Sequence, residues 1–174
     1  MAAKHSLEHH LQSATAPWSS LVVIPQGATA KSVIQPPSGF ALRTVNGKQC
    51  GTPAKLFDEF ARAMEFPDYF GRNWDALEEC LADLEWLPAN GYVILITEAQ
   101  AVLPDDDDEY ETFLEVLSDA GEAWSKGQGG TGRIAPFHVL LAVSQKEKGS
   151  RKHWGVEEVS ARESGPQKRS RARS

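Results

Sequence analysis

The chain has 174 residues, of which 41% are hydrophobic and 24% charged, a composition typical of one soluble globular domain with tails. No apolar run approaches the ~20 residues of a membrane-spanning helix, and the first residues lack the basic-then-apolar order of a secretory signal, so we expect a cytoplasmic protein. The net charge of −6 is divided unevenly, because residues 40–145 carry 19 acidic and seven basic residues whereas residues 146–174 carry four acidic and nine basic residues. A domain this acidic repels nucleic acid and attracts basic partners over about 8 Å at physiological salt.

The N-terminal residues are predicted to form an extension that precedes the main domain. His5, His9 and His10 lie in a polar segment that we expect to be frayed. A metal clamp formed by His5 and His9 on a helix is the less favoured interpretation, because no third ligand has a suitable spacing. Residues 21–24 form a β-branched run ended by proline and predict an extra strand, and the turn cluster at residues 36–39 marks the start of the compact domain.

The central segment alternates between strand-like and helix-like patterns. Strands are predicted at residues 40–45, 92–96 and 137–143, and helices at residues 53–66, 73–84 and 108–126. The middle strand is a continuous apolar run, which is typical of a strand buried on both faces. Buried strands separated by helical connections predict an α/β fold with a small parallel sheet and crossover helices.

Two segments lack such patterns. Residues 127–132 include four glycines and are predicted to be a flexible loop. Residues 146–174 have no periodic apolar face and are predicted to be a disordered basic tail, in which Trp154 and Val156 dock locally. The favoured role of this tail is a solubilising end or a segment that folds back on the acidic body. RNA contact is the alternative, made by Lys168, Arg169, Arg171 and Arg173.

The second predicted helix has two different faces. Its buried stripe is predicted to contain Trp74, Leu77, Leu81 and Leu84, which follow one another at helical spacing. Another face carries Asp75, Glu78 and Glu79 without basic neighbours, and like charges at i, i+4 cost a few tenths of a kcal/mol per pair. From charge alone, this face is either simply solvated or matched to a basic partner.

No catalytic residue, cofactor or metal ligand is predicted. The run Asp105, Asp106, Asp107 and Asp108 lacks the alternation of a calcium loop and is better explained as the solvated start of a helix. His138 lies in an apolar strand and is predicted to be a hydrogen-bonded core histidine in preference to a general base. Cys50 and Cys80 show no metal-type spacing and are expected to be reduced, buried thiols.

The second helix and the loop before it resemble one known family. The sequences PDYFG at residues 67–71 and NWDAL at residues 73–77 are similar to the loop and helix start of barstar, the intracellular inhibitor of the ribonuclease barnase. The likeness covers residues 40–144. It implies a barstar-like, three-stranded parallel sheet packed with helices, and blocking of a ribonuclease active site by carboxylates on the helix.

The resemblance also implies a set of partner contacts. Asp75 falls on an inhibitory aspartate of the family, and Glu79 takes the place of the central aspartate. Glu78 and Leu84 stand where the family has tryptophans, which predicts a target with an altered cleft. The residues expected to contact the partner are Tyr69, Gly71, Asn73, Asp75, Glu78, Glu79 and Asp119.

The sequence thus predicts an extension (residues 1–39), a barstar-like domain (residues 40–145) and a basic disordered tail (residues 146–174). The expected function is that of a monomeric cytoplasmic inhibitor, not an enzyme, bound one-to-one to a basic ribonuclease or related toxin nuclease. Neither membrane association nor direct nucleic-acid binding by the acidic domain is expected. The alternatives are a carboxylate-metal hydrolase that uses Asp105 to Asp108, and an RNA-associated adaptor that uses the tail.

Overall fold

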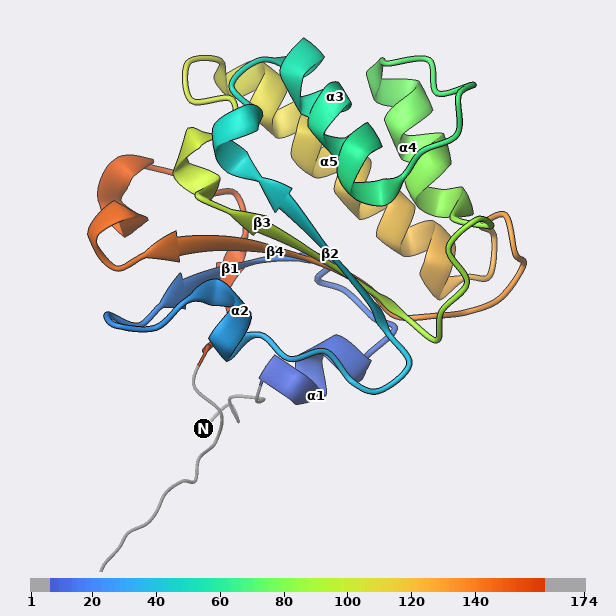
Figure 1. Cartoon of the computed structure of the whole chain (residues 1–174), viewed down its shortest axis with the longest axis horizontal. Coiled ribbons are helices and arrows are strands. Elements are labelled where there is room, and N and C mark those ends of the chain that lie inside the picture. Colours follow the sequence, from blue (N-terminus) through green and yellow to red (C-terminus); the bar gives the residue numbers. More distant parts are fainter. Residues whose placement is uncertain (1–6, 162–174) are drawn as a thin grey trace, which may run out of the picture.

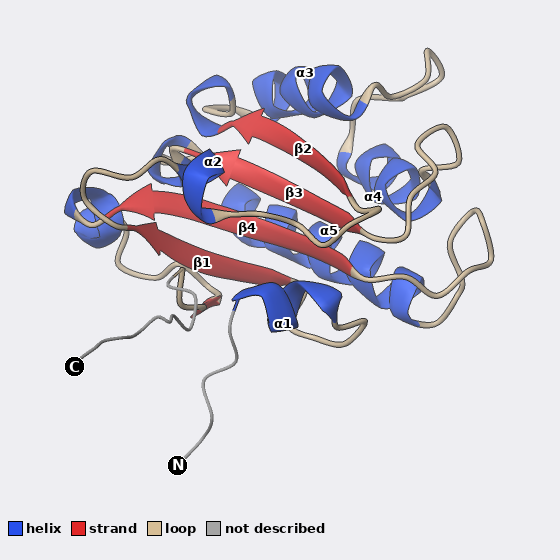
Figure 2. Cartoon of the chain, turned by 60° about the horizontal axis from the view of Figure 1, so that its bottom comes forward, coloured by secondary structure: helices blue, strands red, loops and turns tan. Residues whose placement is uncertain are grey.

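The computed structural model describes residues 7–161 and shows a parallel five-stranded sheet between two layers of helices (Figures 1 and 2). The strand order is β2-β3-β4-β1-β5. The strands are β1 (Ser19–Ile24), β2 (Ala41–Asn46), β3 (Tyr92–Thr97), β4 (Phe137–Ser144) and β5 (Glu157–Glu158). The helices are α1 (Leu7–Gln12), α2 (Ala30–Val33), α3 (Pro53–Met64), α4 (Trp74–Asp83) and α5 (Asp107–Ser125), with three short 3₁₀ turns, η1 (Gly47–Gln49), η2 (Ala99–Ala101) and η3 (Lys146–Ser150).

The predicted parallel α/β architecture is confirmed, but the prediction of three strands is wrong. All four pairings in the sheet are parallel, and β2, β3 and β4 are the three strands predicted for the main domain. The predicted extra strand is β1, which runs beside β4 over its full length, from Ser19 opposite Val139 to Ile24 opposite Ser144. β5 then adds to the far side of β1. The extension therefore belongs to the same sheet as the main domain.

Each face of the sheet has its own hydrophobic core. α3, α4 and α5 cover one face, where the fully buried Phe60, Phe113 and Trp124 pack. On the other face, Leu7 and Leu11 from α1 pack with side chains of the central strands. The prediction of a frayed N-terminal segment is therefore wrong from residue 7 onward, because two leucines four apart cover an apolar sheet face that would otherwise meet water. His5 lies outside the described residues.

Side-chain caps fix the starts of α3 and α5. The Thr52 hydroxyl accepts a hydrogen bond from the Lys55 amide, and Pro53 occupies the first turn of α3. Asp106 is the N-cap of α5, since its carboxylate accepts from the Glu109 amide at 3.1 Å. Asp107 and Asp108 follow in the first turn and are exposed. The acidic run is therefore the solvated start of a helix, as predicted.

Residues 146–161 correct the prediction of a disordered tail, because aromatic contacts hold this segment against α5. The Tyr110 hydroxyl donates to the Trp154 carbonyl at 2.7 Å, and the Arg151 guanidinium lies 3.9 Å from the centre of the Tyr110 ring. Trp154 is buried, so the predicted local docking of this residue is confirmed. The four basic residues assigned to RNA contact lie outside the described residues.

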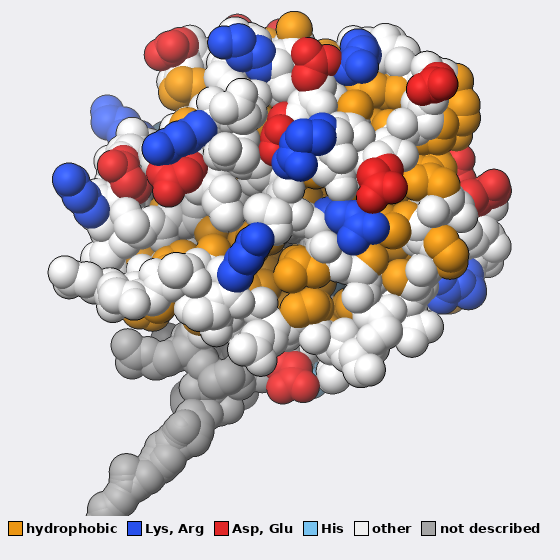
Figure 3. All heavy atoms as spheres, in the orientation of Figure 1, with side chains coloured by type: hydrophobic (Ala, Val, Ile, Leu, Met, Phe, Trp, Pro, Cys, Tyr) orange, Lys and Arg blue, Asp and Glu red, His pale blue; other side chains and the backbone are white. Residues whose placement is uncertain are grey.

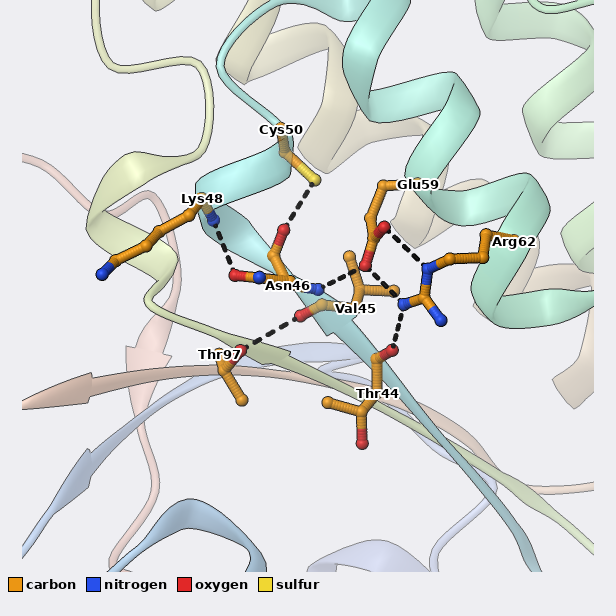
Figure 4. A network of polar contacts seen from close by, with 8 residues as sticks. All are labelled: Thr44, Val45, Asn46, Lys48, Cys50, Glu59, Arg62 and Thr97. Carbon is orange, nitrogen blue, oxygen red and sulfur yellow. Dashed lines mark hydrogen bonds and ion pairs between the residues drawn. The ribbon is translucent and has the colours of Figure 1, made fainter.

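Side chains of α3 cover polar backbone groups of the edge strand β2 (Figure 4). The buried Glu59 carboxylate accepts from the Asn46 amide at 2.7 Å and from the Arg62 guanidinium at 2.6 Å. Arg62 in turn donates to the Thr44 carbonyl at 3.4 Å. An edge strand presents unpaired backbone groups, and here the Glu59–Arg62 pair satisfies two of them.

Candidate partner-binding site

α4 is fixed by its buried side, as the helical spacing predicted. Leu77, Leu81 and Leu84 are fully buried. Trp74 is half-buried, meets the Phe57 ring edge-on at 4.9 Å and donates through its indole N–H to a Glu109 carboxylate oxygen at 3.0 Å. These contacts tie α4 to α3 and α5, so its outer face is held on a rigid base.

Asn73 sets the start of α4. Its side-chain oxygen accepts from the Ala76 amide at 2.8 Å, and its side-chain nitrogen donates to the Gly71 carbonyl at 3.3 Å. Both residues are exposed, and their observed contacts are local. Asn73 and Gly71 therefore shape the turn that leads into the helix, and their contact with a partner stays a prediction.

Four predicted site carboxylates share one electrostatic environment: Asp75, Glu78, Glu79 and Asp119, here called the carboxylate patch. Partial burial, followed by the charges of the other three, raises the pKa of Glu78. Asp75, Glu79 and Asp119 are exposed, and Glu78 is half-buried. The structure thus brings Asp119 of α5 near the acidic face of α4, and its contact with a partner stays a prediction.

No cation neutralises this patch in the part of the chain that the structure describes. Residues 7–161 contain five ion pairs, and none of them includes a member of the carboxylate patch. The nearest candidate by sequence is Arg72, but its guanidinium pairs with Asp58 of α3 and lies 5.7 Å from the centre of the Phe70 ring. The charge on α4 is therefore left for solvent or for a partner.

Tyr69 projects from the loop beside α4, and its side chain is 70% exposed. Its hydroxyl donates to an Asp83 carboxylate oxygen at 3.4 Å. Partial desolvation and the nearby Asp83 charge raise the pKa of the Tyr69 phenol. The neighbouring Phe70 is buried against Phe66, with ring centres 4.8 Å apart, which anchors the loop and holds the tyrosine outward.

Asp83 lies beside Tyr69 in the candidate site, and the sequence did not single it out. It ends α4, and it lies fourteen residues from Tyr69 along the chain, so helical spacing could not pair the two. The face drawn in Figure 3 shows hydrophobic side chains gathering at the right-hand end, where Figure 1 places α4 and the loop before it. The candidate site therefore combines apolar surface with carboxylates.

The titratable residues elsewhere in the core are poorly suited to catalysis. Burial, reinforced by His10, lowers the pKa of His138 to about 4, and a ring nitrogen of His138 lies 2.6 Å from the Ser13 carbonyl. This confirms a hydrogen-bonded core histidine. Burial raises the pKa of Cys80 to about 11 and that of Cys50 to about 12, and both are free thiols, as predicted.

Two further features of the described residues bear on the other candidate roles. Among the described residues, no group of three or more histidine, cysteine, aspartate or glutamate side chains is arranged to hold a metal ion. The run from Asp105 to Asp108 is therefore not such a group. None of the helices in residues 7–161 is long and apolar enough to cross a membrane. The metal-hydrolase alternative thus gains no support from the geometry.

The fold is a parallel sheet with helices on both faces. With the carboxylate patch of α4 and α5 on its surface, it defines a small α/β protein with an acidic surface site. The family model described as Barstar (barnase inhibitor) matches residues 40–142, more than half of the chain, and the protein therefore belongs to the barstar family. The family consists of ribonuclease inhibitors, not enzymes. A comparison with curated proteins gave no match.

Proposed function

We propose that this protein is a cytoplasmic inhibitor that binds one ribonuclease molecule and blocks its active site with the carboxylate patch and Tyr69. The observation that carries the proposal is the patch itself: four carboxylates on two packed helices with no ion-pair partner in the described chain. Membership of the barstar family supports a ribonuclease as the partner.

The mechanism follows from what a ribonuclease must bind. Its cleft is basic because it holds phosphates, and carboxylates on a rigid helix can occupy those positions without being cleaved. Asp75 and Glu79 are exposed on a helix whose opposite side is packed, so little conformational freedom is lost on binding. The acidic body adds long-range attraction, which speeds encounter and weakens as salt is added.

Each contact has a distinct expected role. Asp75 and Glu79 are assigned to the basic groups of the cleft, because they are the exposed members of the patch on α4. Tyr69 supplies the aromatic anchor, since exposed tyrosines contribute strongly at protein interfaces. Glu78, which stands where the family has a tryptophan, is already crowded by charge in the free protein and is relieved by a cation on the partner.

The proposal is tested by capture and inhibition. Full-length protein is used to retain ribonucleases from the native cell extract, and barnase is assayed in parallel. Titration of RNA cleavage with the wild-type chain then measures the inhibition constant. The double variant Asp75→Ala/Glu79→Ala is expected to weaken inhibition at least about 100-fold, since each residue is assigned as a hot spot. An unchanged inhibition constant would exclude this binding mode.

A matched control separates local contact from overall charge. Asp105→Ala/Asp107→Ala removes the same number of charges from exposed positions at the start of α5, outside the patch. This control is expected to change only the salt-dependent association rate, by less than about tenfold. If both double variants weaken inhibition equally, general electrostatic attraction explains the binding and the assignment of Asp75 and Glu79 is wrong.

A further inference from the structure

Two large hydrophobic side chains are exposed in the part of the chain that the structure describes. They are Tyr69, at 70%, and Ile134, at 62%. Apolar side chains exposed singly need no explanation, so the question is whether the segments that carry these two side chains adjoin. Tyr69 belongs to the proposed site, whereas Ile134 lies in the loop between α5 and β4.

The glycine-rich part of this loop rests on the C-terminal end of α4. The Gly130 amide donates to the Ala82 carbonyl at 3.1 Å. A Cβ on Gly130 would clash with the Asp83 carboxylate, and one on Gly129 would clash with the Ala82 carbonyl, so glycine permits this close approach. Figure 1 shows the loop, coloured orange, beside this end of α4. Asp83 therefore touches the loop on one side and Tyr69 on the other.

Residues 127–132 form a loop, as predicted, and hydrogen bonds hold this loop and the residues after it at several points. The Gln128 amide donates to the Ala123 carbonyl at 2.8 Å, and the Ala135 amide donates to the Trp124 carbonyl at 3.3 Å. The Arg133 guanidinium donates to the Ala89 carbonyl at 2.5 Å. Gly129 and Gly130 allow the loop to pack closely against Ala82 and Asp83. Ile134 is thus presented on a fixed base, which lowers the entropy lost on binding.

One carboxylate, that of Asp83, lies between Tyr69 and the glycine-rich loop. Asp83 places one carboxylate oxygen on the Tyr69 hydroxyl, and its other oxygen is buried without a hydrogen-bond partner among the described residues. The loop carries two cations: Lys126 forms an ion pair with Glu122, and Arg133 donates through its guanidinium to the Ala89 carbonyl. The surface from Tyr69 to Ile134 therefore adds apolar groups to the carboxylate-bearing surface of α4 and is continuous with it through Asp83, which fits the same partner.

We propose that the ribonuclease-binding surface extends from Tyr69 across the C-terminal end of α4 to Ile134, which packs against an apolar part of the enzyme beside its basic cleft. This inference rests on the proposed function and adds a second anchoring region to it. The two regions have different roles in recognition: the carboxylate patch binds the basic cleft, and Ile134 contacts the surface beside the cleft. Such a contact favours one nuclease over others that share only a basic cleft.

The test compares Ile134→Ser with Ile134→Leu, both in the full chain. The probes are barnase and the purified ribonuclease retained by the wild-type chain. Ile134→Ser is expected to weaken inhibition about tenfold, and Ile134→Leu is expected to stay within about twofold, because it keeps the apolar volume. Thermal unfolding of each variant checks the fold, which a side chain this exposed should not affect. Gly130→Ala, which displaces the loop against Asp83, should also weaken inhibition.

The outcomes separate the two proposals. If Asp75→Ala/Glu79→Ala weakens inhibition and Ile134→Ser does not, the extended surface is wrong and the proposed function stands. If Ile134→Ser and Ile134→Leu weaken inhibition equally, the contact is not apolar and the inference is wrong. If neither barnase nor any retained ribonuclease is inhibited by the wild-type chain, both proposals are wrong.

Discussion

The acidic side chains of α3 and α4 have opposite surroundings, although the two helices pack in the same layer. On α3, Asp58 pairs with Arg72, and Glu59 binds both Arg62 and the Asn46 amide. On α4, the members of the carboxylate patch have no ion pair within residues 7–161. Glu59 on α3 therefore stabilises the fold, whereas the acidic residues of the patch on α4 repel one another in the free protein.

This contrast separates structural charge from binding charge. Burial of the Glu59 carboxylate would be costly without its two partners, the Asn46 amide and the Arg62 guanidinium. The carboxylate is therefore held at the edge strand β2 by its hydrogen bonds. Partial burial and, after it, repulsion by the other members of the carboxylate patch raise the pKa of Glu78. Removing Glu59 from α3 should therefore lower stability without changing inhibition, whereas removing a patch carboxylate from α4 should weaken inhibition without lowering stability.

The largest change in stability is expected at Glu59. Glu59→Ala leaves the Asn46 amide without its acceptor and Arg62 without its carboxylate, and should lower the free energy of unfolding by about 2 kcal/mol. Urea denaturation measures the loss, and the inhibition constant should not change. Asp58→Ala is the matched control: its ion pair with Arg72 is exposed on both sides, so the loss should stay below about 0.5 kcal/mol. Equal losses would show that Glu59 has no special structural role.

The pH dependence of stability should have opposite signs for the two helices. The hydrogen bond from Arg62 lowers the pKa of Glu59 below its usual 4.5, so the stability it contributes is present above pH 4.5 and is lost as the pH falls through the lowered value. Burial and the neighbouring carboxylates raise the pKa of Glu78 above 4.5, so stability falls as the pH rises through that range.

Denaturation of Glu59→Gln and Glu78→Gln at several pH values checks these signs. The wild type should be more stable than Glu59→Gln at pH 7, and less stable than Glu78→Gln. Both differences should shrink as the two carboxylates become protonated. A wild type that is more stable than both variants at pH 7 would contradict the contrast between the helices.

The smallest expected effect is the gain from Glu78→Gln itself. Removing one charge from the carboxylate patch should raise the free energy of unfolding at pH 7 by about 0.2–0.5 kcal/mol, because it relieves like-charge repulsion on the helix. The same substitution should weaken ribonuclease inhibition if Glu78 faces a cation of the enzyme. A gain in stability without any loss of inhibition would remove Glu78 from the proposed contacts.

Much of this protein is determined locally and could be predicted from the sequence. The apolar run at β3, the Thr52–Pro53 start of α3 and the buried stripe of α4 depend on spacing and capping, which act within a few residues. The acidic face of α4 follows from the same periodicity. These features were predicted correctly because neighbours in the chain decide them.

Tertiary structure alone decided which distant segments meet. β1 pairs with β4 more than a hundred residues away, and the two leucines of α1 cover a sheet face to which β1, β3 and β4 all contribute. Asp83 meets Tyr69 and the glycine-rich loop for the same reason. The sequence placed carboxylates on one helix face, but which of them lack a cation depends on where Arg62 and Arg72 fold, because an ion pair forms through space and not along the chain.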